Sequence, residues 1–308
     1  MKVLVTGATG LVGSALQPSL VAAGHTVTIL TRGAASPPGH LHWDPAAGTL
    51  DPASISGFDA VVHLAGENIA AGRWTPARKA AIRNSRVEGT RLLATALAKA
   101  AARPRVMVCA SAIGYYGHRG AEHLTESSPR GTGFLPEVCE AWEGAAAPAR
   151  ERGIRVVHAR FGVILSTQGG ALARMLLPFR LGAGGVVGNG QQYMSWISLD
   201  DAAGALLSML NNESLSGPVN VVAPQAVSNR EFTRALGSAL SRPTIFPMPA
   251  FAARLAFGEL ADALLLASTR VTPQRLTAAG FLYHDRQILE ALKRLLARGS
   301  ISGPARPA

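Results

Sequence analysis

Lysine is almost absent from this chain of 308 residues, so its basic residues are nearly all arginines. The basic residues number 30 against 19 acidic ones, which gives a formal net charge of +11. The arginines are scattered, and no basic run is interleaved with aromatic residues, which make up only 6% of the chain. This pattern argues against a nucleic-acid partner and favours a positive field that attracts anionic cofactors.

Cysteine and long apolar runs are also scarce. The two cysteines, Cys109 and Cys139, lack the spacing of a metal site, so we expect free thiols in a reducing compartment and no metal. No apolar run reaches the roughly 18 residues that cross a bilayer. Because the first predicted strand begins at residue 2, we expect no signal peptide, a cytoplasmic location and no membrane partner. The length allows one nucleotide-binding domain with a smaller partner domain.

The first thirty-two residues predict one strand–helix–strand unit. The apolar run Val3–Val5 predicts a buried strand, and an Ala/Leu-rich stretch that ends at Gly24 predicts a helix. A second strand is predicted over Val27–Leu30. Between the first strand and the helix stands the turn Thr6-Gly7-Ala8-Thr9-Gly10-Leu11-Val12-Gly13. A glycine turn at this place in a βαβ unit is typical of dinucleotide-binding proteins.

Each glycine of this turn has its own physical role. Gly7 permits a tight turn, Gly10 lets the backbone approach a pyrophosphate, and Gly13 lets the helix pack closely on the strands. The start of the helix also offers free N–H groups and a positive dipole end to phosphates. The alternative is that this turn has only a structural role and binds no cofactor. We therefore predict cofactor contacts at Gly7, Thr9, Gly10, Leu11, Val12 and Gly13.

The second predicted strand ends at Thr31-Arg32, where NAD and NADP are usually distinguished. An acidic side chain there would accept hydrogen bonds from the ribose 2′-hydroxyl of NAD. A hydroxyl and a guanidinium instead suit the 2′-phosphate of NADP. The sequence therefore predicts NADP(H) as the cofactor, with a solvated surface arginine as the alternative for Arg32.

Strand and helix signals alternate up to residue 165. Thr75 is expected to cap the first helix after the opening unit. The alternation predicts an α/β fold, a Rossmann doubly wound parallel sheet that binds ligands at the carboxyl ends of its strands. Further strands are predicted over 59–64, 105–110 and 155–161, and helices over 75–101 and 135–152.

The pattern changes in the second half of the chain. We predict a Rossmann domain over 1–165, with its sheet completed by parts of 190–225, and an interleaved substrate-binding part over 166–246. Residues 247–296 predict a smaller, mostly helical C-terminal region with one extended piece near Phe281–Tyr283. Residues 297–308 predict a disordered tail. Within the second half, Ser228 and the residue three places later predict a helix capping box.

Several motifs in register resemble the extended short-chain dehydrogenase/reductases, the nucleotide-sugar epimerase/dehydratase superfamily. They are TGATGLVG (6–13), HLAG (63–66), ASAIGYYG (110–117) and WISLDDAA (196–203). The chain is more narrowly similar to an epimerase subgroup that includes short-chain dehydrogenase family 39U and bacterial cell-division-inhibitor-like proteins. The signatures for this subgroup are LAGENI (64–69), CEAWE (139–143), MLLPFRLGAGG (175–185), SWISLDD (195–201) and VTPQRL (271–276). The subgroup's own C-terminal domain corresponds to residues 247–296.

The resemblance implies further NADP(H) contacts. Ala65-Gly66, a small pair after a strand, would let the backbone pass beside bound adenosine. Arg86 stands where the superfamily usually has Asn, and its guanidinium could reach the cofactor phosphates. A surface ion pair with Glu88 is the alternative for Arg86. The contacts implied are Thr31, Arg32, Leu64, Ala65, Gly66, Arg86 and Val163.

The superfamily's usual Tyr-x-x-x-Lys pair is absent. The chain has no lysine between Lys99 and Lys293, so none of its four tyrosines has a lysine four residues later. The resemblance puts Cys139 at the position of the tyrosine and Glu143 at that of the lysine. A neighbouring carboxylate would raise the pKa of a thiol, so a buried apolar role is the better interpretation for Cys139. Glu143 either accepts hydrogen bonds from ribose hydroxyls or pairs with an arginine.

Three residues are candidates for catalysis: Ser111, Tyr116 and Glu143. Ser111 lies within one residue of the superfamily's catalytic Ser/Thr and would position a substrate carbonyl or hydroxyl. Tyr116 is the phenol that could replace the missing acid, with simple packing as the alternative. His63, on a predicted buried strand, is interpreted as a core residue.

Two functions fit these features. The first is an NADP(H)-dependent oxidoreductase or epimerase-like enzyme, acting on a small molecule bound between the Rossmann domain and the C-terminal part. The second is a catalytically silent NADP(H)-binding sensor or interaction protein. The lost Tyr/Lys pair favours the silent sensor. The intact cofactor turn and the polar residues favour the enzyme. A homodimer is a further expectation.

Overall fold

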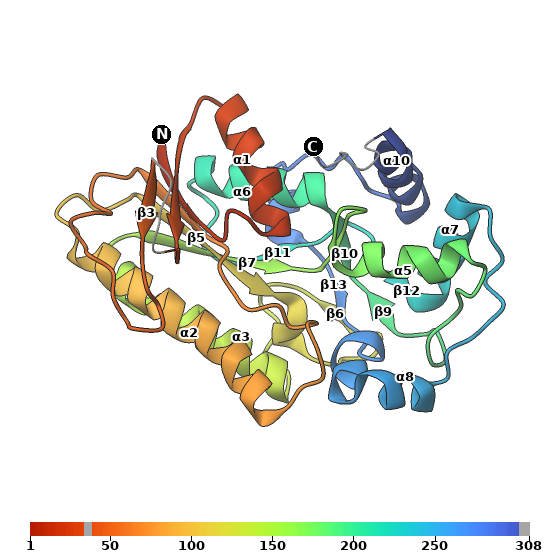
Figure 1. Cartoon of the computed structure of the whole chain (residues 1–308). Coiled ribbons are helices and arrows are strands. Elements are labelled where there is room, and N and C mark those ends of the chain that lie inside the picture. Colours follow the sequence, from red (N-terminus) through yellow and green to blue (C-terminus); the bar gives the residue numbers. More distant parts are fainter. Residues whose placement is uncertain (34–38, 302–308) are drawn as a thin grey trace, which may run out of the picture.

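The computed structural model describes residues 1–33 and 39–301, and a seven-stranded parallel sheet runs through its centre (Figure 1). The strand order is β11-β7-β5-β4-β1-β2-β3. The chain starts at β1, next to the middle strand, winds outward to β3, returns to β4 beside β1 and winds outward to β11. The strands are β1 (Lys2–Thr6), β2 (Thr26–Thr31), β3 (His40–His42), β4 (Ala60–His63), β5 (Val106–Ala112), β7 (Arg155–Phe161) and β11 (Gly217–Val221).

This order confirms the predicted doubly wound sheet, with its switch point between β1 and β4. The apolar runs predicted the central strands well, and β7 has the predicted bounds. The short edge strand β3 was not predicted, because its three residues His40–His42 lie in a polar, Pro/Gly-rich stretch. In that setting they carry no apolar signal, and only pairing with β2 makes them a strand.

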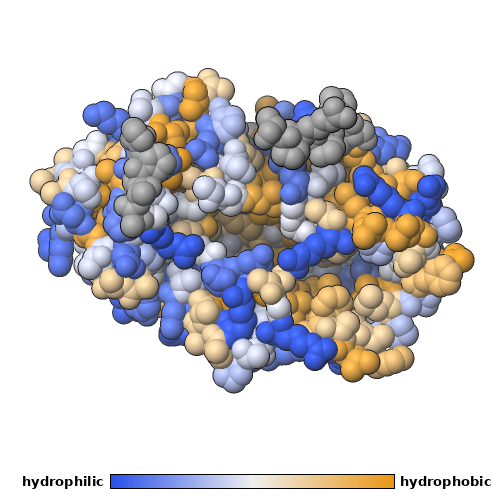
Figure 2. Space-filling model, in the orientation of Figure 1, coloured by the Kyte–Doolittle hydropathy of each residue, from blue (hydrophilic) through white to orange (hydrophobic). Residues whose placement is uncertain are grey.

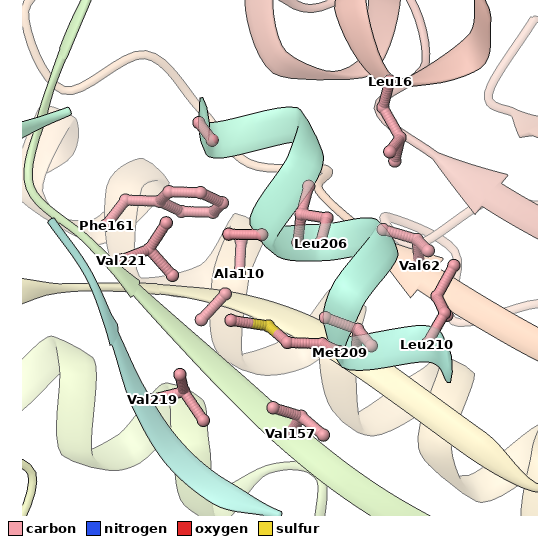
Figure 3. Packing of buried hydrophobic residues seen from close by; sticks show 14 of the residues in the cluster. Leu16, Val62, Ala110, Val157, Phe161, Leu206, Met209, Leu210, Val219 and Val221 are labelled. Atoms are coloured by element: carbon pink, nitrogen blue, oxygen red, sulfur yellow. The ribbon is translucent and has the colours of Figure 1, made fainter. Parts of the chain in front are cut away.

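Helices cover both faces of the sheet (Figure 1). One face packs against α1 (Leu11–Ala22) and α6 (Leu199–Asn211), and Figure 3 shows Leu16 of α1 and Leu206 and Met209 of α6 above strand residues such as Val157. The other face packs against α2 (Pro76–Lys99), α3 (Phe134–Gly144) and α4 (Ala147–Glu151). These two apolar cores hold the carboxyl ends of the strands in place.

Local signals set the ends of several helices. The hydroxyl of Thr75 accepts the N–H of Arg78 at 3.1 Å and caps α2, as predicted. The capping box at Ser228 and Glu231 is also confirmed, at the start of α7 (Asn229–Leu240). The helix predicted over 135–152 is instead two helices, α3 and α4. Pro148 lies in the first turn of α4, where its missing N–H and its ring break continuity with α3.

The rest of the chain surrounds the carboxyl end of the sheet. Three two-stranded ribbons pair β10 with β8, β12 with β9 and β13 with β6. A third apolar core joins α5, α7 and α10. The helices and strands not yet given bounds, with η for a 3-10 or π-helix, are η1 (Ile113–Tyr116), β6 (His123–Leu124), β8 (Val163–Leu165), α5 (Gly170–Arg180), β9 (Tyr193–Met194), β10 (Trp196–Ser198), β12 (Val227–Ser228), α8 (Ala250–Phe257), η2 (Ala261–Leu265), β13 (Arg270–Val271), α9 (Gln274–Ala278) and α10 (Ile288–Ile301).

Two expectations for the C-terminal region were wrong. The extended piece is at Arg270–Val271, where it pairs with β6, and not near Phe281–Tyr283. Phe281 and Tyr283 instead contact each other edge to face, with ring centroids 4.8 Å apart, and pack against the main core. Helix α10 continues to Ile301, so the tail does not begin at residue 297. Residues 302–308 of that predicted tail lie outside the described residues.

Across residues 1–33 and 39–301, every helix is too short or too polar to cross a bilayer. In the same ranges, no three His, Cys, Asp or Glu side chains gather where they could hold a metal ion.

Candidate functional site

The turn after β1 is packed so closely that only glycine fits at two of its positions. Gly7 has φ +68°, and a Cβ there would lie 2.7 Å from the backbone nitrogen of Ala65 in the turn after β4. A Cβ at Gly13 would lie 2.3 Å from the carbonyl oxygen of Gly7. The turn therefore touches β4 on one side and the first turn of α1 on the other, as the glycine spacing predicts.

The open side of the turn presents unsatisfied backbone donors. Gly10 is the N-cap of α1 and donates its own N–H to the Gly7 carbonyl at 3.0 Å. The amides of Leu11, Val12 and Gly13 lie in the first turn of α1, before the helix's internal hydrogen bonds begin. Together with the helix dipole these groups suit a pyrophosphate.

A neutral network of buried polar side chains, here called the histidine network, supports this turn from below. Thr6 Oγ1 accepts the N–H groups of Leu64 and Ala65, each at 3.2 Å, so its own proton goes to His63 Nδ1 at 2.7 Å. His63 Nε2–H in turn donates to Thr90 Oγ1 at 3.0 Å. Burial lowers the pKa of His63 to about 4, so its ring stays neutral. His63 is thus a satisfied core residue, as the sequence predicts.

Arg86 of α2 lies beside the small pair that follows β4. A Cβ on Gly66 would be 3.4 Å from its guanidinium carbon, and that carbon lies 5.0 Å from the centroid of the Trp142 ring. Its Nη1 donates to the carbonyl of Ile82 at 3.1 Å. Burial lowers the pKa of Arg86, so an anion placed there would relieve a poorly solvated charge. These contacts, and not an ion pair with the exposed Glu88, fix Arg86 within the described residues.

The remaining predicted cofactor residues lie at neighbouring strand ends. Thr31 closes β2, and Arg32 follows it with its side chain exposed at the carboxyl edge of the sheet. Val163 begins β8, just after β7, and donates its N–H to the carbonyl of Ser195 at 2.9 Å. Leu64, after β4, is half-buried. The structure thus brings the residues named for the cofactor to one edge of the sheet, while their contacts with a cofactor stay predictions.

The three candidate catalytic residues belong to one second network, here called the arginine network. Ser111 Oγ, at the end of β5, donates to Glu143 Oε1 at 2.7 Å. Arg160 of β7 donates to both carboxylate oxygens of Glu143, each at 2.8 Å. Arg160 is only 3% exposed, whereas the side chain of Glu143 is 12% exposed. Of the two alternatives for Glu143, pairing with an arginine is observed.

Arg160 also reaches Tyr116. Its Nη1 donates to the Tyr116 hydroxyl at 3.0 Å, and that hydroxyl donates to Asn220 Oδ1 at 2.7 Å. The guanidinium carbon lies 3.6 Å from the centroid of the Tyr115 ring. Burial alone would lower the pKa of Arg160. The hydrogen bonds to Glu143 and the charge of Glu143 outweigh burial and raise this pKa above its ordinary value. The ion pair is therefore charged, and both carboxylate oxygens of Glu143 accept from Arg160.

Tyr116 is fully buried, and its hydroxyl already has two partners. Burial raises the pKa of Tyr116, outweighing the opposite effect of Arg160. This geometry favours the packed alternative, and a catalytic role for Tyr116 stays a prediction. The thiol of Cys139 is also buried, and burial together with the charge of Glu143 raises its pKa to about 12. Such a thiol is a small apolar group at neutral pH.

The sequence interpretation missed Arg160, Asn220 and Thr90. The signal for Arg160 was its place inside the apolar strand Arg155–Phe161, since a charge within such a run must find a buried partner. Asn220 lies in β11 in the same way, and its amide donates to the carbonyl of Thr272 at 3.0 Å. Thr90 sits on the buried face of α2 and accepts from Trp142 Nε1 at 2.9 Å.

Comparison with known proteins adds relatives over the whole chain. The model of the NAD dependent epimerase/dehydratase family matches residues 3–223, and a domain of unknown function, DUF1731, matches residues 248–295. The epimerase family protein MT2273 of Mycobacterium tuberculosis is 46% identical over 290 residues, which cover 94% of this chain and 96% of the relative. The human epimerase family protein SDR39U1 is 39% identical over 300 residues, covering 96% of this chain and all of the relative.

Two solved structures are similar to this chain over nearly its whole length. The crystal structure of human SDR39U1 (isoform 2) with NADPH matches with a TM-score of 0.88 at 37% identity, covering 96% of this chain and 99% of that chain. The UDP-glucose 4-epimerase of Thermus thermophilus in complex with NAD matches with a TM-score of 0.76 at 20% identity, covering 98% and 100%, a likeness of fold alone. By its family match and by these relatives, the chain belongs to the NAD dependent epimerase/dehydratase family.

Proposed function

We propose that this protein binds NADP(H) across the carboxyl edge of its sheet and acts as an oxidoreductase or epimerase-like enzyme on a small molecule. The observation that carries the proposal is the glycine turn, which presents the first-turn amides of α1 to a pyrophosphate. Arg32 and Arg86 supply the charges that a 2′-phosphate and the other phosphates require. The NADPH named with the human relative supports the same cofactor.

The residues that would hold the cofactor follow the strand order. Thr31 and Arg32, after β2, would bind the adenosine ribose and its 2′-phosphate, and the turn after β1 the pyrophosphate. Leu64, Ala65 and Gly66 after β4 would lie against the adenosine. Ser111 at the end of β5 and Val163 just after β7 continue this edge on the other side of the switch point, so the nicotinamide end of the cofactor would lie there.

Ser111 and Glu143 supply the polar chemistry at that end. When bound, the nicotinamide supplies or accepts a hydride. Because Ser111 donates its own proton to Glu143, its oxygen lone pairs are available to a substrate hydroxyl. A proton from that hydroxyl can pass to Ser111 as the Ser111 proton passes to Glu143. Arg160 balances the charge of Glu143 and fixes its orientation.

The substrate in this proposal is a small alcohol or carbonyl compound bound between the Rossmann domain and the C-terminal part. A nucleotide-sugar is the form suggested by the family. A cytoplasmic location belongs to the same proposal, supported by the two cysteines, Cys109 and Cys139, which are buried free thiols.

A silent NADP(H)-binding sensor is the second candidate, and one observation favours it. The position of the family's lysine holds Glu143, which is already paired with Arg160. The position of its tyrosine holds a thiol whose pKa is about 12. Both candidates share the cofactor site and differ only in turnover.

The test is to identify the nucleotide extracted from the purified protein and then to follow NADPH oxidation against a panel of carbonyl compounds and nucleotide-sugars. Substrate-dependent oxidation supports the enzyme, and Ser111→Ala should reduce its rate by roughly 10²-fold or more. Ser238→Ala, a change at an exposed serine of α7, is the matched control and should have no effect. Binding without turnover across the panel favours the sensor, and failure to bind any nucleotide contradicts both.

Arg32→Asp tests the choice of cofactor separately. The new carboxylate should repel the 2′-phosphate and accept from the ribose hydroxyl, so we expect the preference to reverse from NADPH to NADH. Titration of both nucleotides against the wild type and the variant measures it. Unchanged affinity for NADPH would show that Arg32 is only a surface charge.

A further inference from the structure

Large apolar side chains are exposed together on one part of the C-terminal region. Leu181 is 74% exposed, Phe251 72% and Leu255 75%. Single exposed apolar residues are normal, but a contiguous group of this size marks an interaction site. We call this group the α5–α8 face, and define it as Leu177, Leu181, Ile245, Phe246, Phe251 and Leu255.

Backbone contacts hold together the two segments that carry the α5–α8 face. The segment after α5 is bonded to the segment before α8, since Met248 donates to the carbonyl of Val186 at 2.8 Å and accepts from Gly188 at 2.9 Å. A Cβ on Gly185 would lie 1.9 Å from the carbonyl oxygen of Phe246, so the two segments touch. Figure 2 shows apolar residues gathered over α5 and α8 on the right of the molecule.

The charges around this face are mostly positive. Arg254 pairs with Asp262, and Lys79 pairs with Glu259 beside α8. Other guanidiniums here bond to carbonyl oxygens, which do not cancel their charge: Arg242 to that of Arg180 at 2.9 Å, and Arg73 to that of Leu255. Arg180 itself is exposed next to Leu181. The positive excess agrees with the net charge of +11.

We propose that the α5–α8 face docks on an anionic membrane surface. Phe and Leu side chains on α8 would enter the boundary between headgroups and acyl chains, while the arginines meet lipid phosphates. A second copy of this chain fits less well, because it would bring the same positive rim against the first. The contact is peripheral, and it revises the expectation that the protein has no membrane partner. It does not depend on the cofactor proposal.

Vesicle flotation of the full chain tests this proposal. The chain should float with vesicles of phosphatidylcholine and phosphatidylglycerol, bind pure phosphatidylcholine weakly, and lose binding as salt rises. The double variant Phe251→Ser, Leu255→Ser should weaken binding roughly tenfold or more. The double variant Arg180→Glu, Arg242→Glu should weaken binding to the anionic vesicles alone. Leu282→Ser, at a residue 86% exposed and outside the face, is the control and should bind as the wild type does.

Two outcomes would overturn the proposal. The first is no flotation with anionic vesicles by a wild-type protein that has the circular dichroism spectrum of a folded chain. The second is equal loss of binding in the Leu282→Ser control. Sedimentation at several concentrations completes the test, because a dimer that the Phe251 and Leu255 variant dissociates, without vesicle binding, would assign the face to a second copy.

Discussion

The histidine network and the arginine network are both buried and both join several elements at the carboxyl edge of the sheet, but they differ in charge. The first links Thr6, His63, Thr90 and Trp142 through neutral groups, and the ring N–H groups of His63 and Trp142 both have an acceptor. The second contains a full ion pair between Arg160 and Glu143. The fully buried His63, with its pKa lowered to about 4, holds its surroundings in place, whereas the carboxylate of Glu143 can accept a proton.

Exposure to solvent differs between the two networks as well. His63 and Thr90 are fully buried beneath the glycine turn. The side chain of Glu143 is 12% exposed, and Ser111, 3% exposed, lies beside it at the end of β5. Under the proposed function, the histidine network would support the pyrophosphate turn and the arginine network would serve substrate chemistry. Each prediction below changes one network and leaves the other as its internal reference.

Arg160→Met should have the largest effect on stability. It removes both hydrogen bonds to Glu143 and leaves a nearly buried carboxylate unpaired, which costs about 3–5 kcal/mol in the free energy of unfolding. Urea denaturation measures this cost. The double variant Arg160→Met, Glu143→Leu should recover most of the loss, because no uncompensated charge remains. A loss below about 1 kcal/mol in the single variant would show that the pair is not buried as described.

His63 should make stability depend on pH. Its pKa is about 4 in the folded state against 6.5 for an ordinary histidine, so between these values the unfolded chain binds a proton that the folded chain does not. The free energy of unfolding should therefore fall as the pH falls from 6.5 to 4, by up to about 3 kcal/mol from this residue. Urea denaturation of wild type and His63→Gln across this range isolates it. Parallel pH profiles would contradict the assignment.

Thr90→Val should cost about 1–3 kcal/mol, because the N–H groups of His63 and Trp142 both lose their acceptor. Thermal or urea unfolding measures the loss. Thr90→Ser keeps the hydroxyl and should lose much less. Equal losses in the two variants would mean that the methyl group, and not the hydrogen bonds, is what matters at this position.

Tyr116→Phe should have the smallest effect. It removes one hydroxyl that accepts from Arg160 and donates to Asn220, at a cost of about 1 kcal/mol. Because that hydroxyl is buried and its pKa is raised, we expect any turnover found to be retained. Rates of NADPH oxidation before and after the change measure this. Complete loss of turnover with unchanged stability would restore Tyr116 as the proton donor.

The sequence predicted the half of the site that depends on neighbours along the chain. The glycine turn, the end of β2, the cap at Thr75 and the capping box at Ser228 are all local patterns, and the structure has each of them. The turn's fit against Ala65 depends on the parallel pairing of β1 with β4 across the switch point, which the first βαβ unit alone does not imply.

The arginine network could not be predicted in this way, because Ser111, Glu143 and Arg160 come from different elements up to 49 residues apart (160 − 111). Arg160 carries a charge inside an apolar strand, and only the fold shows which carboxylate meets it. The same holds for β3, which only pairing with β2 makes a strand. The α5–α8 face is also built from segments that are distant in the sequence, so no single apolar run could predict it.

The central claim is that the turn after β1 binds NADP(H). Calorimetric titration of the purified full chain with NADPH and with NADH tests this claim most directly. The account predicts one site per chain with a clear preference for NADPH, lost in Gly13→Val, where a side chain would overlap the Gly7 carbonyl. Gly72→Val, at an exposed glycine with open space around it and no positive φ, is the control for the added side chain. Saturation with neither nucleotide, or tighter binding of NADH by the wild type, would contradict the account.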